Sequence, residues 1–336
     1  MRRLFNLEKL TLIIPTYNSE KYLPELTDRL KKLKSIQIIF VDDGSSLEAR
    51  KDLSHIARNL KAKVIFNQHR GVSYARNFGL KICKTPYVAF LDSDDLFEVA
   101  VFQAIIDRLD TIDSYDIISF ALGQKNSEYS TANDKKNLVK QILKIIPSRE
   151  CIPAPFSKIY RLKMLQDHKI EFPIGVKVGE DMLFNAEAFL VAKRIYVSEV
   201  SYYLYRQNLA SVTHKVEYNI VDNNKKFLTR LKIILTKYCS KEDAADWYQE
   251  MVLITWLSDS FQAVIQSKDN NELIELRKFL RQNISIKKML FNTLPKRRKF
   301  LAWLFLFELY PMIRLLIGKR KKFDETLAKN STLVKV

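Results

Sequence analysis

Three apolar runs near the start of the sequence each end in a cluster of polar residues. The runs are TLIIPTYN from Thr11, IQIIFVDDGSS from Ile36 and YVAFLDSDD from Tyr87. A shorter run, KVIFN, lies between the second and the third, and the intervening segments have the spacing of amphipathic helices. Strands that are apolar throughout and alternate with helices are typical of a parallel sheet covered on both faces. The sequence therefore predicts an α/β fold with three polar clusters at the carboxyl edge of the sheet, where ligands bind.

The regular alternation of strands and helices weakens after Asp116. A loop, a helix and a strand are expected between residues 171 and 197, and from Val216 the pattern is entirely helical. We expect an α/β domain at residues 1–215, a helical region at 216–292 and a basic tail at 293–336. MRRLFNLEKL lacks the apolar core and the cleavage site of a signal peptide, so it is interpreted as the start of the fold.

The chain carries 56 Lys and Arg against 38 Asp and Glu, a net charge of +18 that indicates an anionic partner. Much of the excess flanks an apolar stretch, with basic clusters at 296–299 and 319–322. Glu308, Pro311 and Arg314 interrupt this stretch, which argues against a spanning helix. Basic flanks around Trp and Phe predict that residues 296–322 lie on an anionic membrane surface. The alternatives are a helix pair packed onto the protein itself and a homo-oligomer interface.

The cysteines are few and widely spaced. Cys83, Cys151 and Cys239 form no CxxC pair, so a disulfide framework and a cysteine-based zinc site are not expected. A reducing compartment fits this usage best.

The segment FLDSDD places three carboxylates within four residues, at Asp92, Asp94 and Asp95. Carboxylates this close repel one another unless a cation neutralises them. Mg²⁺ and Mn²⁺ prefer oxygen ligands and are usually held by one or two carboxylates together with substrate phosphates. An N-cap of the following helix would account for one of the three aspartates but not for all of them. The cluster therefore predicts a divalent metal site.

Five segments, in this order and at these intervals, resemble the family 2 glycosyltransferases with the GT-A fold. They are TLIIPTYNSEKYL, IIFVDDGSS, GVSYARNFGL, YVAFLDSDD and GEDMLFN, and the resemblance covers residues 9 to 214. It implies a Rossmann-like, mostly parallel sheet flanked by helices, here followed by an all-helical region. It also implies an inverting enzyme that uses a nucleotide-diphospho-sugar, usually a UDP-sugar, together with Mn²⁺ or Mg²⁺.

The resemblance assigns roles by position. Asp181 matches the catalytic base, Asp43 the residue that hydrogen-bonds the nucleotide base, and Arg76 a residue near the donor phosphates. The metal ligands it implies are Asp92 and Asp94, with Asp95 adjacent and His214 in a closing segment over the diphosphate. The residues placed at the nucleotide-sugar are Pro15, Thr16, Tyr17, Asn18, Asp42, Asp43, Arg76, Asp92, Ser93, Lys158, Glu180, Arg206 and Ser211.

Each motif alone has a structural interpretation. DDGS is an ordinary turn sequence, and Glu180 with Asp181 suits the first turn of a helix. Arg76 alone would be a surface arginine, and His214 is more often structural than a ligand. The chemistry nevertheless requires these residue types, because a sugar hydroxyl needs a carboxylate to take its proton and a departing diphosphate needs cations to stabilise it.

We therefore expect a hexosyl- or N-acetylhexosaminyltransferase at the cytoplasmic face of the membrane. It would extend a cell-surface glycan or a lipid-linked oligosaccharide of capsule, exopolysaccharide or teichoic acid type. A sugar nucleotidyltransferase is disfavoured because PTYNSEKYL contains no glycine. Nucleic-acid binding is disfavoured because no reading motif is present. A non-catalytic partner subunit stays open as the alternative, although the acidic motifs are intact.

Overall fold

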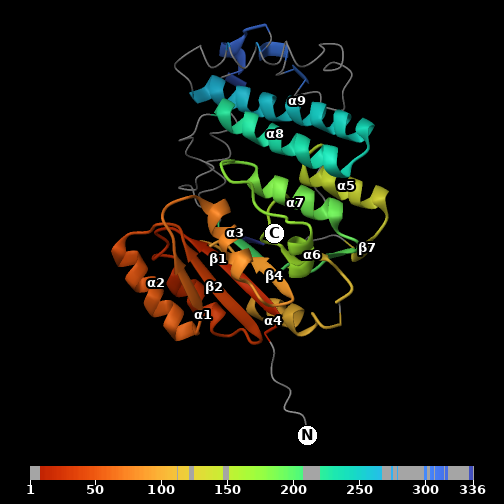
Figure 1. Cartoon of the computed structure of the whole chain (residues 1–336). Coiled ribbons are helices and arrows are strands. Elements are labelled where there is room, and N and C mark those ends of the chain that lie inside the picture. Colours follow the sequence, from red (N-terminus) through yellow and green to blue (C-terminus); the bar gives the residue numbers. More distant parts are fainter. Residues whose placement is uncertain are drawn as a thin grey trace. The chain divides into compact units, whose positions relative to one another are not determined.

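The computed structural model describes residues 8–111, 113–120, 125–146, 151–206 and 220–266, with shorter stretches between 274 and 335. It divides into two compact units. The first comprises residues 1–207 together with 333–336, and the second comprises residues 208–332. The first unit holds the large sheet (Figure 1). The residues of the three polar clusters also belong to this unit.

An eight-stranded mixed sheet in the order β3-β2-β1-β4-β8-β6-β9-β7 forms the centre of the first unit. The strands β3, β2, β1 and β4 are parallel, as predicted, and so are β6 and β9. Strands β8 and β7 run antiparallel to their neighbours. The strands are β1 (Leu10–Thr16), β2 (Ile36–Asp42), β3 (Lys63–Phe66), β4 (Tyr87–Phe90), β6 (Ile117–Phe120), β7 (Ser127–Tyr129), β8 (Lys158–Arg161) and β9 (Ile195–Ser198). The prediction of an α/β fold with a mostly parallel sheet is confirmed.

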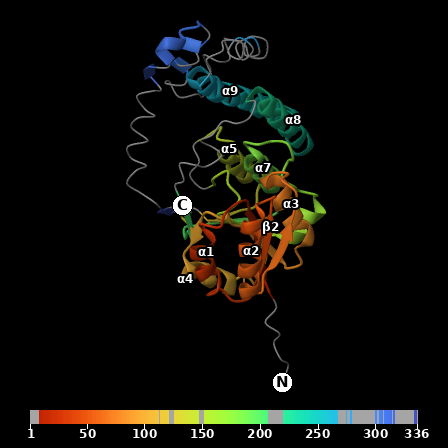
Figure 2. The same cartoon turned by 90° about the vertical axis from the view of Figure 1, so that its left-hand side faces the viewer.

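Helices connect and cover these strands (Figures 1 and 2). They are α1 (Leu23–Leu30), α2 (Leu47–Leu60), α3 (Val72–Ile82), α4 (Val99–Asp107), α5 (Ala132–Ile142), α6 (Leu162–Asp167) and α7 (Glu180–Val191). Helix α3 comes very close to β1, because a Cβ atom at Gly79 would lie 2.6 Å from a methyl group of Ile13. Glycine at this position therefore permits the contact that fixes α3, and Arg76 with it, over the central strand.

Strand β1 continues through Pro15 and Thr16. These are the last two residues of the strand, and they pair with β2. Proline is tolerated because pairing with β4 ends at Ile13, whose carbonyl accepts from Leu91 on that side. Two residues further on, the ring nitrogen of Pro15 faces the same side, where no β4 partner requires a donor.

A second, three-stranded sheet lies beside the first in the same unit. Its order is β11-β10-β5, with both pairs antiparallel. Its strands are β5 (Leu96–Phe97), β10 (Tyr203–Arg206) and β11 (Leu333–Lys335). Residues 333–335, which the sequence analysis places in the basic tail, thus form a strand against β10. The pattern of the sequence did not reveal this strand.

The described part of the second unit is built mainly from helices, and the predicted helical C-terminal region is confirmed. Helices α8 (Ile220–Tyr238) and α9 (Lys241–Gln266) lie side by side (Figure 1). Leu231 and Leu235 on α8 and Trp247 on α9 are buried. Among the residues that the structure describes, no helix is long and apolar enough to cross a bilayer.

Candidate active site

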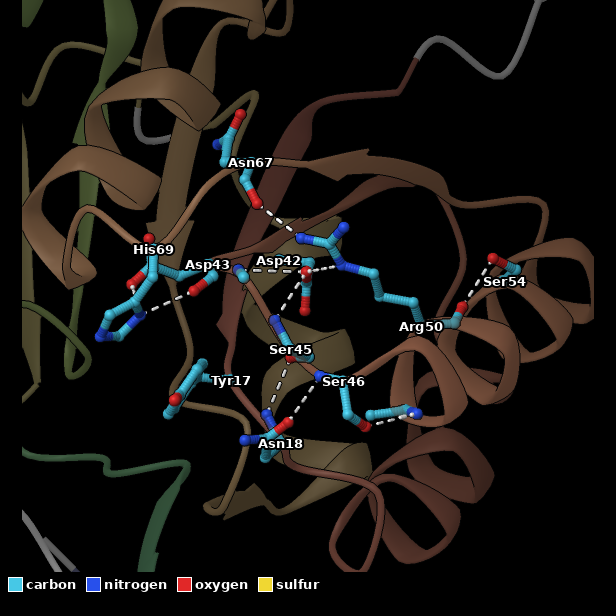
Figure 3. A network of polar contacts seen from close by, with 12 residues as sticks. Tyr17, Asn18, Asp42, Asp43, Ser45, Ser46, Arg50, Ser54, Asn67 and His69 are labelled. Atoms are coloured by element: carbon cyan, nitrogen blue, oxygen red, sulfur yellow. Dashed lines mark hydrogen bonds and ion pairs between the residues drawn. The ribbon is translucent and has the colours of Figure 1, made fainter.

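The turn after β2 is built around two neighbouring aspartates with different partners (Figure 3). Asp42 is fully buried, and its Oδ2 accepts hydrogen bonds from the backbone of Gly44 and Ser45 and from Arg50 Nε. Asp42 is therefore committed to holding its own turn. The Asp43 carboxylate instead accepts from the backbone N–H groups of the next loop, at Arg70 and Gly71.

The loop after β1 joins this turn (Figure 3). Asn18 has a left-handed backbone with φ of 45°, donates its N–H to Ser45 Oγ and accepts from the N–H of Ser46. Tyr17 is 51% exposed, and its ring stacks on His69 with centroids 4.5 Å apart. His69 Nδ1 in turn lies 3.0 Å from Asp43 Oδ2. The turn and the two loops thus present an exposed aromatic pair beside a carboxylate.

Arg76 on α3 links two of the acidic motifs. Its Nη2 donates to Asp92 Oδ1 at 2.9 Å, and its Nη1 donates to Asp181 Oδ1 at 2.6 Å. Glu180 lies 3.6 Å from the same Nη1. The Arg76 side chain is only 4% exposed and lies over the ring of Phe172. DSDD and GED, almost ninety residues apart in the sequence, therefore meet at one guanidinium group.

The electrostatics of this cluster follow from burial and charge. Burial alone would lower the pKa of Arg76, but the carboxylates of Asp181, Asp92 and Glu180 raise it, so the guanidinium stays charged. Burial raises the pKa of Asp181 above its ordinary value, although Arg76 opposes the shift. Burial also raises the pKa of Glu180, and the nearby Asp181 adds to this effect. Such perturbed carboxyl groups are common at catalytic sites.

The three aspartates of the DSDD segment have different surroundings. Asp92 is 30% exposed and contacts Arg76, and Asp94 is partly buried, with its backbone carbonyl accepting from Arg206 Nε. Asp95 is buried, and its two oxygens accept from Tyr203 Oη and from the N–H of Arg206. Burial raises its pKa to about 7. Asp95 therefore anchors β10 to the acidic segment.

The acidic side chains near Arg76 can be compared with the ligands that a divalent metal ion needs. In the described part of the chain, no three His, Cys, Asp or Glu side chains are grouped so that they could hold a metal ion. Asp92 and Asp94 are the two carboxylates of this segment that are only partly buried. Two carboxylates suit an ion that completes its coordination with substrate phosphates and water. The residues present fit Mg²⁺ or Mn²⁺ held in this shared way.

Three other predicted site residues, Ser93, Arg206 and Lys158, bond to residues outside the Arg76 cluster. Ser93 Oγ is 2.7 Å from Ser19 Oγ in the loop after β1. Arg206 also pairs with Glu25 at 2.7 Å. Lys158 is fully buried on β8 and donates to backbone carbonyls. Ser211 and His214 lie outside the described residues.

Sequence reasoning missed His69, Tyr203 and Asn185, which contact predicted site residues. His69 follows β3 by three positions, so the rule that ligands gather beyond strand ends could have found it. Tyr203 contacts Asp95 across 108 residues of sequence, and no local pattern predicts such a bond. Asn185 contacts the carbonyl of Asp181 four residues before it, but its other partners, Pro153 and Tyr160, are far away in the sequence.

Comparison with known proteins agrees with this geometry. The family described as "Glycosyl transferase family 2" matches residues 11–189. The chain is 29% identical over 218 residues to the uncharacterized glycosyltransferase EpsJ of Bacillus subtilis, covering 60% of this chain and 62% of EpsJ. It is 31% identical over 202 residues to the poly(ribitol-phosphate) beta-N-acetylglucosaminyltransferase TarS of Staphylococcus aureus, covering 58% of this chain and 35% of TarS. The alignments thus span less than two thirds of the length of either relative.

A solved structure shares the fold. The crystal structure of S. aureus TarS 1–349 in complex with UDP-GlcNAc superimposes with a TM-score of 0.67 at 21% identity. The match covers 93% of this chain and 92% of that one. The GT-A fold is therefore confirmed.

Proposed function

Because the chain belongs to glycosyl transferase family 2, we propose that it moves a sugar from a nucleotide-diphospho-sugar to a hydroxyl group of a glycan or lipid-linked acceptor, with inversion. The observation that carries this proposal is the bridge from Asp92 through Arg76 to Asp181. Arg76 bonds both Asp92, in the segment proposed to bind the donor diphosphate, and Asp181, a carboxylate able to accept a proton. The groups needed to stabilise the leaving group and to activate the acceptor therefore lie close together.

Asp181 acts as the general base in this proposal. Its carboxylate takes the proton of the acceptor hydroxyl as that oxygen attacks the anomeric carbon. Attack from the face opposite the departing diphosphate inverts the configuration. Arg76 holds the carboxylate in place through the 2.6 Å bond and supplies positive charge beside the leaving group. Both effects require Arg76 to stay charged, as its surroundings ensure.

Asp92 and Asp94 would hold the divalent cation, Mn²⁺ or Mg²⁺. When bound, this ion neutralises negative charge that develops on the departing diphosphate. The surrounding side chains orient these ligands. Arg76 donates to Asp92, and Arg206 donates to the backbone of Asp94. Asp95 and Lys158, expected from the sequence as a ligand and a substrate contact, are proposed instead to be structural, since both are buried and paired inside the protein.

The donor is proposed to be a UDP-sugar. A TarS structure contains UDP-GlcNAc, and the aromatic pair of Tyr17 and His69 lies next to the Asp43 carboxylate. Such a site suits a planar base that stacks on a ring and donates an N–H to a carboxylate. The relative TarS is named for transfer to poly(ribitol-phosphate), which favours a cell-surface polymer of teichoic acid or related type as the acceptor.

The stacking contact gives the first test of the proposed function. Replacing Tyr17 with Ala should raise the Kd for UDP by roughly 5–100-fold, as expected for the loss of one base–aromatic stack. Isothermal titration calorimetry with UDP and Mn²⁺ measures this change. Tyr248→Ala, on a helix of the second unit, is the matched control and should leave the Kd unchanged. A wild-type chain that binds no UDP with metal present would contradict the proposed donor.

We also propose that residues 296–322 hold the enzyme at the inner face of the cell membrane. Several apolar side chains in this segment are exposed, including Trp303, Phe307 and Leu315. The rings of Trp303 and Phe307 lie 4.2 Å apart, and basic clusters flank the segment in the sequence. Aromatic side chains at headgroup depth with basic neighbours favour an anionic bilayer surface.

Replacing both Trp303 and Phe307 with Ser should weaken binding to phosphatidylglycerol vesicles by roughly tenfold or more, given the apolar area lost. Vesicle sedimentation measures the bound fraction. The matched control is Phe66→Ser, an exposed phenylalanine of the first unit, which should bind vesicles as the wild type does. Equal binding of the double variant and the wild type would assign the segment to another role, such as a protein interface.

A further inference from the structure

Lys158 is a fully buried cation whose ammonium group binds the backbone of the preceding loop. It lies on β8 with no exposed surface, and its Nζ donates to the carbonyls of Ile152 at 2.9 Å and Ala154 at 2.7 Å. Burial lowers the pKa of Lys158 to about 8, so the ammonium form still predominates at pH 7. Burying a charge is costly unless it is paired, so this placement calls for a reason.

Asn185 completes the support of the same loop. Its Nδ2 donates to the carbonyl of Pro153 at 2.6 Å, and its Oδ1 accepts from Tyr160 Oη at 2.6 Å. Together with Lys158, it binds the carbonyls of three successive residues, 152 to 154. Loop backbone is seldom fixed by buried side chains in this way, because loops usually leave their carbonyls to water.

The loop is tied to the acidic cluster at both ends. The Nδ2 of Asn185 also donates to the carbonyl of Asp181, at 3.0 Å. At the other end, Phe156 stacks on Tyr203 with ring centroids 4.1 Å apart, and Tyr203 Oη donates to Asp95. The loop of residues 151–157 therefore lies between the helix that carries the proposed base and the strand that anchors DSDD.

We propose that Lys158 and Asn185 are positioning residues for the transfer reaction, which fix the loop of residues 151–157 beside Asp181 as a wall of the acceptor side. The inference rests on the proposed function, since it needs Asp181 to face an acceptor hydroxyl. The donor side is formed by other elements, namely the loops after β1 and β2 and the start of α3. Loosening the 151–157 loop should consequently misplace the reacting groups and leave nucleotide binding intact.

The variant Lys158→Met keeps the length of the side chain and removes its donors. We expect kcat for release of UDP from UDP-GlcNAc with Mn²⁺ to fall by roughly 10–100-fold, since a misplacement of about 1 Å can cost this much. The Kd for UDP should stay within about twofold, well below the tenfold change that ~1.4 kcal/mol gives. Amide hydrogen exchange within residues 151–157 should become faster. Lys163→Met, an exposed lysine on α6, should change none of the three.

Each outcome bears on the inference. Unchanged kcat with faster exchange in the loop would overturn it, and so would a rise in the Kd for UDP as large as the fall in kcat. If Lys158→Met does not fold, Asn185→Ala serves in its place, with the same three measurements and expectations. Wild-type protein that fails to bind UDP would refute the proposed function itself, a result separate from any difference between variants.

Discussion

Replacing Asp181 with Asn should lower kcat for sugar transfer by roughly 10²–10⁴-fold, the usual contribution of a general base. The amide has the same shape and can still accept from Arg76, so the fold and the site geometry are retained. Because Asn cannot take a proton, the acceptor hydroxyl loses its route to deprotonation during attack. The Kd for UDP should change by no more than a few fold. Steady-state kinetics with UDP-GlcNAc and calorimetry with UDP measure the two quantities.

The neighbouring Glu180→Gln is the matched control, because Glu180 lies 3.6 Å from the same guanidinium but outside hydrogen-bond range. It should reduce kcat far less than Asp181→Asn. The wild-type pH profile provides a second check. A base must be ionised to act, and burial raises the pKa of Asp181. The acid limb of kcat/KM should therefore lie above the pH at which an ordinary aspartate titrates. Equal losses in the two variants would remove the distinction between base and neighbour.

Replacing Arg76 with Met should destabilise the protein by about 3–5 kcal/mol at pH 7, the cost of breaking a buried ion pair from one side. The substitution leaves Asp92, Asp181 and Glu180 facing one another without their shared cation. Turnover should fall as well, because Asp181 loses its 2.6 Å partner. Denaturant unfolding followed by circular dichroism gives the difference in free energy.

The loss of stability in Arg76→Met should depend on pH in a defined direction. Without the cation, the folded-state pKa values of Asp181 and Glu180 rise further, so the folded variant binds protons more readily than the unfolded chain. Its stability relative to the wild type therefore recovers as the pH falls. Arg194→Met removes an exposed pairing with Glu128 and should cost at most about 1 kcal/mol, with little pH dependence. A deficit in Arg76→Met that does not shrink on acidification would contradict this account.

Much of the fold follows from local pattern. The apolar runs before DDGS and DSDD predict strands, and the parallel pairing of β1 with β2 and β4 follows from the helices between them. The same pattern places Asp43 and Asp92 at one edge of the sheet. Local chemistry also accounts for the start of α7 at Glu180. Gly179 precedes the first turn of this helix and has a left-handed backbone with φ of 96°, which glycine adopts readily.

The remaining features depend on contacts between distant residues. Nothing near Arg76 in the sequence shows that its partners are Asp92 and Asp181. Asp42 and Asp43 are adjacent and identical in the sequence. Only the folded turn shows that Asp42 bonds Arg50, whereas Asp43 bonds the backbone of Arg70. Lys158 resembles a substrate contact by position, yet its strand turns it toward the interior. Side-chain direction is decided by tertiary packing, which periodicity does not encode.

Strand β11 has a topological consequence. The chain leaves the first unit at residue 207 and re-enters it at residue 333, so the helical unit is inserted between two neighbouring strands of one sheet. A fragment cut at residue 207 would lack β11, one of the two strands that pair with β10, and the last residue of β10 donates to Asp95. A minimal transferase domain would have to graft residues 333–336 back through a designed linker.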